Sequence, residues 1–466
     1  MRRQLHLAVL ALISLACGVA AVRLGPPSEA GPAPPAGATD APVLSLRRAP
    51  SVVARAVGDR RLEAALDQVW SASPPSSCLL VTEAGRVVYE RQPDQAVVPA
   101  STLKLLTATA VLDRLEPAAR LRTTVLGPPL GAGGVVDGDL WLVGGGDPVL
   151  GTRPWADHFT RQPALFTPLE TLADRVVGAG VREVRGRVVG DDGRYDQRRY
   201  VASWPPRYMA EHQTGPLSAL SVNDGFAAWD PEDVPFEDPA AGAAGALIDL
   251  LASRGVVVAG GPAAGPRPEG LDVVAAIDSP TIAELVGQML QESDNGTAEL
   301  LLKELGRQVG GGGTTAAGAA AVTEAVADVV GGAGGATVVD GSGLDSGNRV
   351  TCRLLHAVLS RAPEGDALDS GLAVAGHSGT LTKRFLGTLA RGRLRAKTGS
   401  IMGVAALAGY ARTESGSELI FSYVVNGIGR SAQAVPLQDD LGAGLVEYPA
   451  RVDVAALGPA GYAPAA

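Results

Sequence analysis

The pattern of apolar and polar positions predicts regular structure at both ends of the chain. Apolar residues recur at helical spacing over 59–71, which predicts a helix. Five apolar runs have the length and flanking turn residues of strands: 78–81, 86–89, 394–401, 405–413 and 418–425. A further helix is expected over 437–448. These elements predict an α+β fold, with a five-stranded antiparallel sheet built from both ends of the chain and helices on both of its faces.

The middle of the chain has a different pattern of apolar and polar residues. Between 124 and 277, short apolar runs alternate with turns rich in Gly and Asp, which predicts mostly β structure. Helical spacing returns at 281–292 and 297–308. We therefore expect a discontinuous domain made of 59–123 and 278–450, an inserted mostly-β domain at 124–277, and a C-terminal tail at 451–466.

The N-terminus has the features of an export signal. Two arginines, Arg2 and Arg3, precede an apolar run from Leu5 to Val22. The length of this run leaves two interpretations of 1–23, a cleaved signal peptide or a membrane anchor. Residues 24–58 are rich in Pro and Ala and predict a linker. We expect an exported, extracytoplasmic protein that contacts the membrane only through this segment, with 5–22 as the anchor if it is retained.

Charge and lysine usage narrow the possible chemistry. The net charge is −9 and there is no basic cluster, so a nucleic-acid partner is not expected. Lys and Arg together number 40, yet only four are lysines: Lys104, Lys303, Lys383 and Lys397. Arginine cannot give up its proton at useful pH, whereas lysine can. A retained lysine therefore suggests that its amine has a chemical role, although we expect Lys303 and Lys383 to be solvated charges.

Ser101 and Lys104 form the first candidate pair. They are three residues apart at the start of a predicted helix, so their side chains can touch. A serine hydroxyl becomes a strong nucleophile when a neighbouring base takes its proton. Lysine can be that base if burial or a nearby cation lowers its pKa. One such pair alone is weak evidence, because Ser-x-x-Lys is common on solvated helices.

Two further polar clusters follow in order, Ser293-Asp294-Asn295 and Lys397-Thr398-Gly399. Ser293, lying between the two lysines, can relay a proton to a leaving amine. Asn295 can hold the Lys104 amine and a substrate amide. Lys397 can supply a fixed positive charge that lowers the pKa of Lys104 and attracts a substrate carboxylate, to which Thr398 can donate a hydrogen bond.

Three backbone positions complete the predicted site. Gly399 has no side chain and would let the substrate backbone approach the strand edge. The backbone N–H groups of Ser101 and Ser400 would form an oxyanion hole. No histidine, cysteine or carboxylate spacing in the sequence suggests a metal site.

Cys78 and Cys352 are the two cysteines outside the N-terminal segment. In an oxidising compartment they can form a disulfide, and the alternative is a pair of buried free thiols. Cys78 begins the first predicted strand, and Cys352 begins a helix, over 351–361, that we expect to pack on the sheet. This placement predicts a Cys78–Cys352 disulfide.

The three clusters in this order resemble the motif set of β-lactamases and penicillin-binding proteins. The turns at 145–148, 340–344 and 379–381 are similar to those of the penicillin-binding protein 4 type of D-alanyl-D-alanine carboxypeptidase/endopeptidase, the class C low-molecular-mass group. The resemblance covers roughly residues 60–450.

The resemblance implies a penicillin-recognising, transpeptidase-like domain with an insertion. It also implies a serine DD-peptidase that cleaves D-Ala–D-Ala in peptidoglycan stem peptides, and D-Ala–diaminopimelate cross-links, through an acyl-enzyme. β-Lactam antibiotics would be covalent inhibitors, and no metal or nucleotide cofactor is implied. The alternatives are a β-lactamase, for which we find no water-activating Glu, and a scaffold that binds stem peptides without turnover.

Overall fold

The computed structural model describes residues 50–449 except 160 and 333–334. The predicted signal or anchor, the linker up to residue 49 and the tail at 451–466 lie outside the described residues. No helix within the described part is long and apolar enough to cross a membrane.

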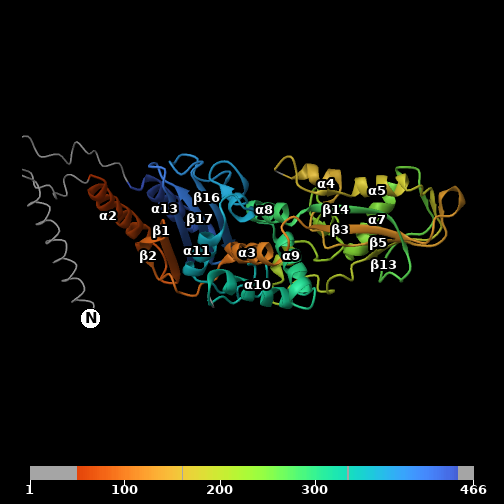
Figure 1. Ribbon diagram of the computed structural model, residues 1–466, viewed down its shortest axis with the longest axis horizontal. Helices are drawn as coiled ribbons and strands as arrows, with labels where there is room; N and C mark the ends of the chain where they lie inside the picture. The colour runs from red at the N-terminus through yellow and green to blue at the C-terminus, as the bar shows by residue number, and fades with distance from the viewer. Residues whose placement is uncertain (1–49, 160, 333–334, 450–466) are drawn as a thin grey trace, which may run out of the picture. The chain divides into compact units, whose positions relative to one another are not determined.

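One antiparallel sheet is built from both ends of the chain (Figure 1). Its strands, from one edge to the other, are β15 (Ala373–Val374), β16 (Leu394–Ile401), β17 (Val404–Arg412), β18 (Glu418–Asn426), β1 (Ser77–Glu83) and β2 (Arg86–Arg91). We predicted five strands, and the sixth is the short β15, which pairs with Arg395 and Ala396. Two residues give no readable alternation, so this edge strand exists only because β16 offers it hydrogen bonds.

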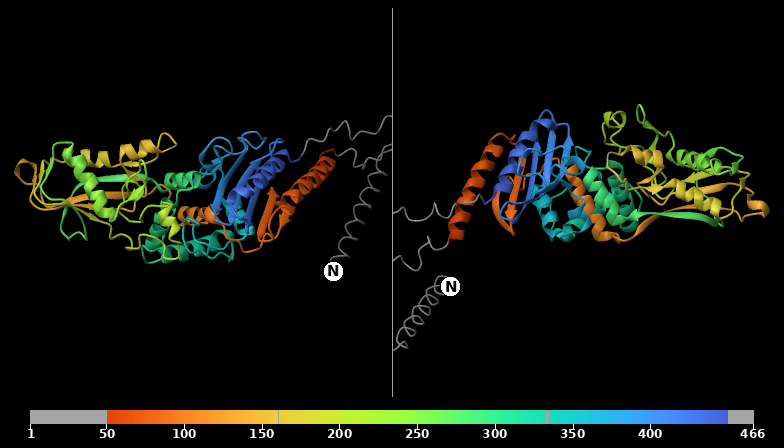
Figure 2. Two further views of the ribbon diagram at one scale, coloured as in Figure 1. Left: turned by 180° about the vertical axis from the view of Figure 1, so that it is seen from behind. Right: turned by 90° about the horizontal axis from the view of Figure 1, so that it is seen from above.

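Helices cover both faces of this sheet (Figure 2). On one face, α2 (Pro50–Ser71) and α13 (Val435–Glu447) pack on side chains such as Leu79, Leu407 and Phe421. The opposite face carries a second apolar core, which includes Leu80 and Ala406. Neighbouring residues along a strand point to opposite faces, and here both faces are buried. This explains why the central strands β17, β18 and β1 are buried along almost their whole length.

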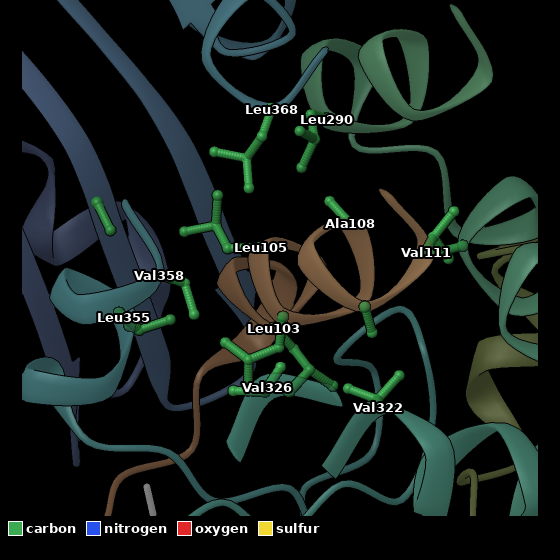
Figure 3. Close-up of a cluster of buried hydrophobic side chains, with 14 of the residues drawn as sticks. Leu103, Leu105, Ala108, Val111, Leu290, Val322, Val326, Leu355, Val358 and Leu368 are labelled. Carbon is green, nitrogen blue, oxygen red and sulfur yellow. The ribbon is translucent and has the colours of Figure 1, made fainter. Parts of the chain in front are cut away.

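Helix α3 (Lys104–Arg114) lies in the centre of the second core. All eight residues from Lys104 to Val111 are buried. Leu105 and Ala108 lie among side chains from several surrounding elements, including Leu290, Val326 and Leu355 (Figure 3). The surrounding helices are α8 (Ile282–Glu292), α9 (Asn295–Val309), α10 (Thr315–Val330) and α11 (Cys352–Arg361). A helix buried all round is held by packing on every side, which fixes the position of its first residue, Lys104.

The middle segment forms its own mixed sheet. The strands run in the order β13 (Pro262–Ala264), β9 (Val188–Asp191), β5 (Leu140–Val143), β3 (Arg120–Gly127) and β14 (Asp272–Thr281). Helices α5 (Leu169–Gly178) and α7 (Pro239–Ala252) pack on this sheet around a separate apolar core. Pairing of β3 with β14 brings the two ends of the segment together. We keep 124 and 277 as the proposed limits of the inserted domain.

Two further expectations differ from the structure. Helix α2 begins at Pro50, so the end of the predicted linker, 50–58, is helical. Residues 217–225, within the stretch that we expected to be mostly β, contain no strand and only the short 3₁₀ turn Asn223–Gly225. Asn223 and Asp224 both have positive φ there, a conformation incompatible with a strand.

A disulfide joins the sheet to α11. Cys78 in β1 and Cys352 at the start of α11 are bonded, with their Cα atoms 5.8 Å apart. Both residues are fully buried. The bond closes a loop with a sequence separation of 274 residues, which includes the whole middle segment.

We predict that this disulfide forms in the exported protein. Peptide mapping without reduction should yield one cross-linked species containing Cys78 and Cys352. Replacing both residues with Ser should lower the free energy of unfolding by about 4–5 kcal/mol, because the unfolded chain would lose a long covalent loop. Alkylation of both thiols in the denatured, unreduced protein would contradict the prediction, and Cys17 is distinguished by its own peptide.

Candidate active site

Ser101 lies in a tight turn rather than in the regular helix that we expected. Residues Ala100–Leu103 form a 3₁₀ turn that runs directly into α3. Ala100 has a φ of 49°, a left-handed conformation that costs a non-Gly residue roughly 1–2 kcal/mol. Ser101 is 9% exposed and Lys104 is fully buried. The hydroxyl therefore reaches the edge of the interior while the amine lies inside it.

The Lys104 amine has three acceptors. Its Nζ donates to Ser101 Oγ at 3.2 Å, to Asn295 Oδ1 at 2.8 Å and to the Ser342 carbonyl oxygen at 2.7 Å. Ser101 and Lys104 thus touch, as their spacing predicted. An ammonium group has three N–H donors, and these three acceptors use all of them. The contact with Ser342 was not predicted.

Ser293 is presented by the turn between α8 and α9. It has a φ of 62° at the C-terminal end of α8, and Asp294 caps α9 by accepting a hydrogen bond from the Thr297 N–H at 2.8 Å. Lys397, which is fully buried on β16, donates to Ser293 Oγ at 2.7 Å. Ser293 was predicted to lie between both lysines, but the structure records a hydrogen bond only to Lys397.

Asn295 connects the site to the middle segment. Its Oδ1 accepts from Lys104, and its Nδ2 donates to the Gln213 carbonyl oxygen at 2.7 Å. The predicted contact with a substrate amide concerns this same side chain, of which one amide hydrogen is already in use. Gln213 itself gave no signal in the sequence, because a backbone carbonyl carries none.

The end of β16 brings the remaining predicted residues to the same place. Thr398 Oγ1 donates to Thr380 Oγ1 at 2.8 Å, and Ser400 Oγ donates to Ser431 Oγ at 2.6 Å. A Cβ on Gly399 would lie 2.8 Å from the Pro99 carbonyl oxygen and 3.2 Å from the Ser101 nitrogen. The absent side chain therefore lets β16 approach the Ser101 turn closely. All eight predicted site residues are thus gathered around the junction of the Ser101 turn, the α8–α9 turn and β16.

Burial dominates the electrostatics of the two lysines. It lowers the pKa of Lys104 to about 8, against the opposing effect of the carboxylates of Asp340, Glu299 and Asp294. Burial also lowers the pKa of Lys397 well below its usual range, and the charge of Lys104 lowers it further. We predicted that the charge of Lys397 would set the pKa of Lys104. Burial instead lowers the pKa of Lys104, because an apolar interior disfavours the charged form, and the repulsion between the two lysines acts on the pKa of Lys397.

Several residues at the site were missed or misread. Lys303 is buried and pairs with Asp196, so it is not the solvated charge that we expected. The turn at 340–344 was visible in the sequence, but its contact with Lys104 was not. Glu299 had no recognisable signal beyond its place four residues after Asn295. Among the described residues, no cluster of three or more His, Cys, Asp or Glu could hold a metal ion.

Comparisons with known sequences agree with this geometry. A model of the D-Ala-D-Ala carboxypeptidase 3 (S13) family matches residues 63–233 and 226–441. Carboxypeptidase DacB from Mycolicibacterium smegmatis is 32% identical, over 92% of this chain and 94% of its own. A D-alanyl-D-alanine carboxypeptidase from Actinomadura sp. (strain R39) is 29% identical, over 79% and 80% of the two chains.

The fold agrees as well. The crystal structure of penicillin binding protein 4 from Haemophilus influenzae superposes with a TM-score of 0.67 at 19% identity, covering 81% of this chain and 97% of that one. The same protein complexed with a β-lactam superposes with a TM-score of 0.61. This confirms the predicted α+β fold with an inserted domain. From the sequence matches and the assembled site, we conclude that the chain belongs to the D-Ala-D-Ala carboxypeptidase 3 (S13) family and that the predicted serine DD-peptidase is confirmed at that level.

Proposed function

We propose that this serine DD-peptidase works through an acyl-enzyme on Ser101, with Lys104 as the general base. The observation that carries the proposal is the buried Lys104 amine, 3.2 Å from Ser101 Oγ, with two further acceptors for its hydrogens. A neutral amine has only two N–H groups. When these are held by Asn295 and Ser342, the lone pair faces the Ser101 hydroxyl. The amine is then oriented to accept the proton of the nucleophile.

The residue roles follow from this geometry. Ser101 Oγ attacks the carbonyl carbon of the penultimate D-Ala while its proton passes to Lys104. The backbone N–H groups of Ser101 and Ser400 stabilise the negative oxygen of the tetrahedral intermediate. Ser293, hydrogen-bonded to Lys397, gives a proton to the nitrogen of the departing D-Ala and regains one from Lys397, and the C–N bond breaks. Water then hydrolyses the ester and regenerates Ser101. In this second half of the reaction Lys104 returns its proton to Ser101 Oγ, and a proton of the attacking water restores Lys397.

We propose peptidoglycan stem peptides as the substrate and β-lactams as covalent inhibitors, in an extracytoplasmic location. A hollow of about 280 Å³ opens beside Ser400, and its lining includes charged and polar side chains from Arg207, Glu211 and Arg430. The lining also includes the apolar side chains of Leu344, Ile401 and Met402, and apolar surface with a few polar groups suits a peptide. Lys397 and Thr398 lie where the terminal carboxylate of the peptide would bind, and Asn295 faces the peptide's amide.

Muropeptide digestion tests the function. We expect the purified protein to release D-Ala from pentapeptide stems, detected by mass spectrometry. Products of cross-linked dimers will show whether it also cleaves D-Ala–diaminopimelate bonds. Stems that remain intact under conditions where penicillin acylates the protein would contradict the proposed peptidase activity on this substrate.

Penicillin should acylate Ser101. We expect benzylpenicillin to add one penicilloyl group to the peptide containing Ser101, and Ser101→Ala to abolish the adduct. Ser415→Ala, at an exposed serine in the β17–β18 turn, is the control and should label normally. An adduct on another residue, or labelling of Ser101→Ala, would refute the assignment of the nucleophile.

Acylation should also depend on the free amine of Lys104. Because the pKa of Lys104 is about 8, the amine is mostly protonated at pH 7 and mostly free at pH 9. The acylation rate should therefore rise over this range. Lys104→Arg keeps a cation but removes the base, so it should lose roughly 10²–10⁴-fold in rate.

Lys303→Arg is the matched control for this variant. Lys303 is also a buried lysine, but it pairs with Asp196, which can bind a guanidinium equally well. It should acylate at nearly the rate of the wild type. A flat pH profile, or a Lys104→Arg protein that acylates as fast as Lys303→Arg, would show that another group is the base.

A further inference from the structure

The turn at Asp340–Leu344 touches both parts of the catalytic pair. The Ser342 carbonyl accepts from Lys104 Nζ at 2.7 Å. A Cβ on Gly343, whose φ is +85°, would lie 2.0 Å from the Ala100 carbonyl oxygen and 3.1 Å from the Ser101 nitrogen. A side chain at this position would therefore push the turn away from Ser101. The position of this turn decides where the Lys104 amine points.

The carboxyl group of Glu299 on α9 binds the backbone of the Asp340–Leu344 turn. Glu299 Oε1 accepts from the Gly341 N–H at 2.9 Å and from the Ser342 N–H at 2.8 Å. Glu299 lies one helical turn after Asn295, so both side chains leave the same face of α9. Asn295 binds the Lys104 amine directly, whereas Glu299 binds the N–H of Ser342, the residue whose carbonyl is the next acceptor. One helix face thus sets two of the three acceptors of Lys104.

Glu299 is the side chain that holds the Ser342 N–H, and other groups hold the rest of the turn. Asp340 accepts from the Gly343 N–H, which shares a peptide unit with the Ser342 carbonyl, and from Asp345 N–H and Trp204 Nε1, so it holds the turn on its other side. Thr107 donates to the Gly341 carbonyl at 2.8 Å. None of these contacts involves the Ser342 N–H. Glu299 is fully buried, and its Oε2 has no hydrogen-bond partner among the described residues. Burying a carboxyl group whose one oxygen has no hydrogen-bond partner costs free energy. The hydrogen bonds that the other oxygen accepts therefore indicate a specific role for this side chain.

We propose that Glu299 is a positioning residue for acylation, which holds the Ser342 carbonyl so that the neutral Lys104 amine directs its lone pair at Ser101 Oγ. The inference rests on the proposed function of Lys104 as the base. Glu299 makes no hydrogen bond to Ser101, and it acts through the N–H groups of Gly341 and Ser342, one peptide unit before the Ser342 carbonyl.

Substitutions at Glu299 separate its acceptor from its charge. Glu299→Gln keeps an oxygen for the two N–H groups, whereas Glu299→Leu removes it. Asp340, Asp294 and Lys397 remain as the other charged groups around Lys104. Burial, together with the charge of Asp340, raises the pKa of Glu299 to about 8. Any charge that Glu299 keeps favours the protonated lysine, so its loss does not disfavour the free amine.

The experiment measures penicillin acylation of the full chain by rapid mixing, which gives the acylation rate constant and the non-covalent dissociation constant separately. We expect Glu299→Leu to lose about 10²-fold in the rate constant with an almost unchanged dissociation constant, because the base is misplaced. Glu299→Gln should stay within about tenfold of the wild type. Glu304→Leu is the matched control, because Glu304 is a buried glutamate of the same helix that binds Arg194 and Tyr195 instead. It should acylate normally even if its melting temperature falls.

Several results would overturn the proposal. One is a folded Glu299→Leu protein that penicillin acylates as fast as the wild type. Another is a change in the dissociation constant without a change in the rate constant. A third is an equal loss in the rate constant for Glu304→Leu. If Glu299→Leu does not fold, Glu299→Asp takes its place, because it keeps the charge but withdraws the oxygen by one methylene. It should lose at least about tenfold in the rate constant, and a wild-type rate would overturn the proposal. If the wild type itself is not acylated, the proposed function fails as well, which distinguishes the two failures.

Discussion

The active site depends on the removal of the Lys104 amine from water. An isolated ammonium group in an apolar interior is strongly disfavoured, so the group either loses its proton or finds partners. Here both occur, since burial lowers the pKa of Lys104 while Ser101, Asn295 and Ser342 surround its Nζ. The apolar core around α3 is what makes this burial possible. The packing of several helices is therefore a chemical property of the site as well as a source of stability.

The second lysine is constrained by the first. Lys397 is equally buried, and the positive charge of Lys104 adds to the effect of burial on its pKa. Two neighbouring ammonium groups repel each other strongly in a site without water, so protonation of one lysine opposes protonation of the other. The hydrogen bond from Lys397 to Ser293 Oγ places the Lys397 proton beside the hydroxyl that we propose protonates the leaving amine. Lys397 is therefore not simply a fixed positive charge, because its protonation depends on that of Lys104.

The middle segment takes part in holding the site. Its Gln213 carbonyl accepts from Asn295, and its Trp204 donates to Asp340 at 2.9 Å. These contacts reach α9 and the turn at Asp340–Leu344, which together position the acceptors of Lys104. The segment thus does more than occupy a long connection between β3 and β14. It also buries polar groups of the catalytic part that would otherwise need water.

The sequence by itself determined the fold class and the chemical groups. Strand periodicity identified the five long strands of the sheet, and three short motifs identified Ser101, Lys104, Ser293, Asn295 and Lys397, because these signals are local and depend on side-chain type. It could not determine the edge strand β15, which depends on a partner rather than on its own two residues. Nor could it determine the contacts of Ser342 and Gln213, which act through backbone carbonyls that every residue has. The sequence also could not reveal the burial of Lys303 or the contacts of Glu299. A charged residue gives the same sequence signal whether it is exposed to water or pairs with a residue far away along the chain. Only the tertiary structure decided these points, since it brought α9, the Asp340–Leu344 turn and β16 to one buried amine.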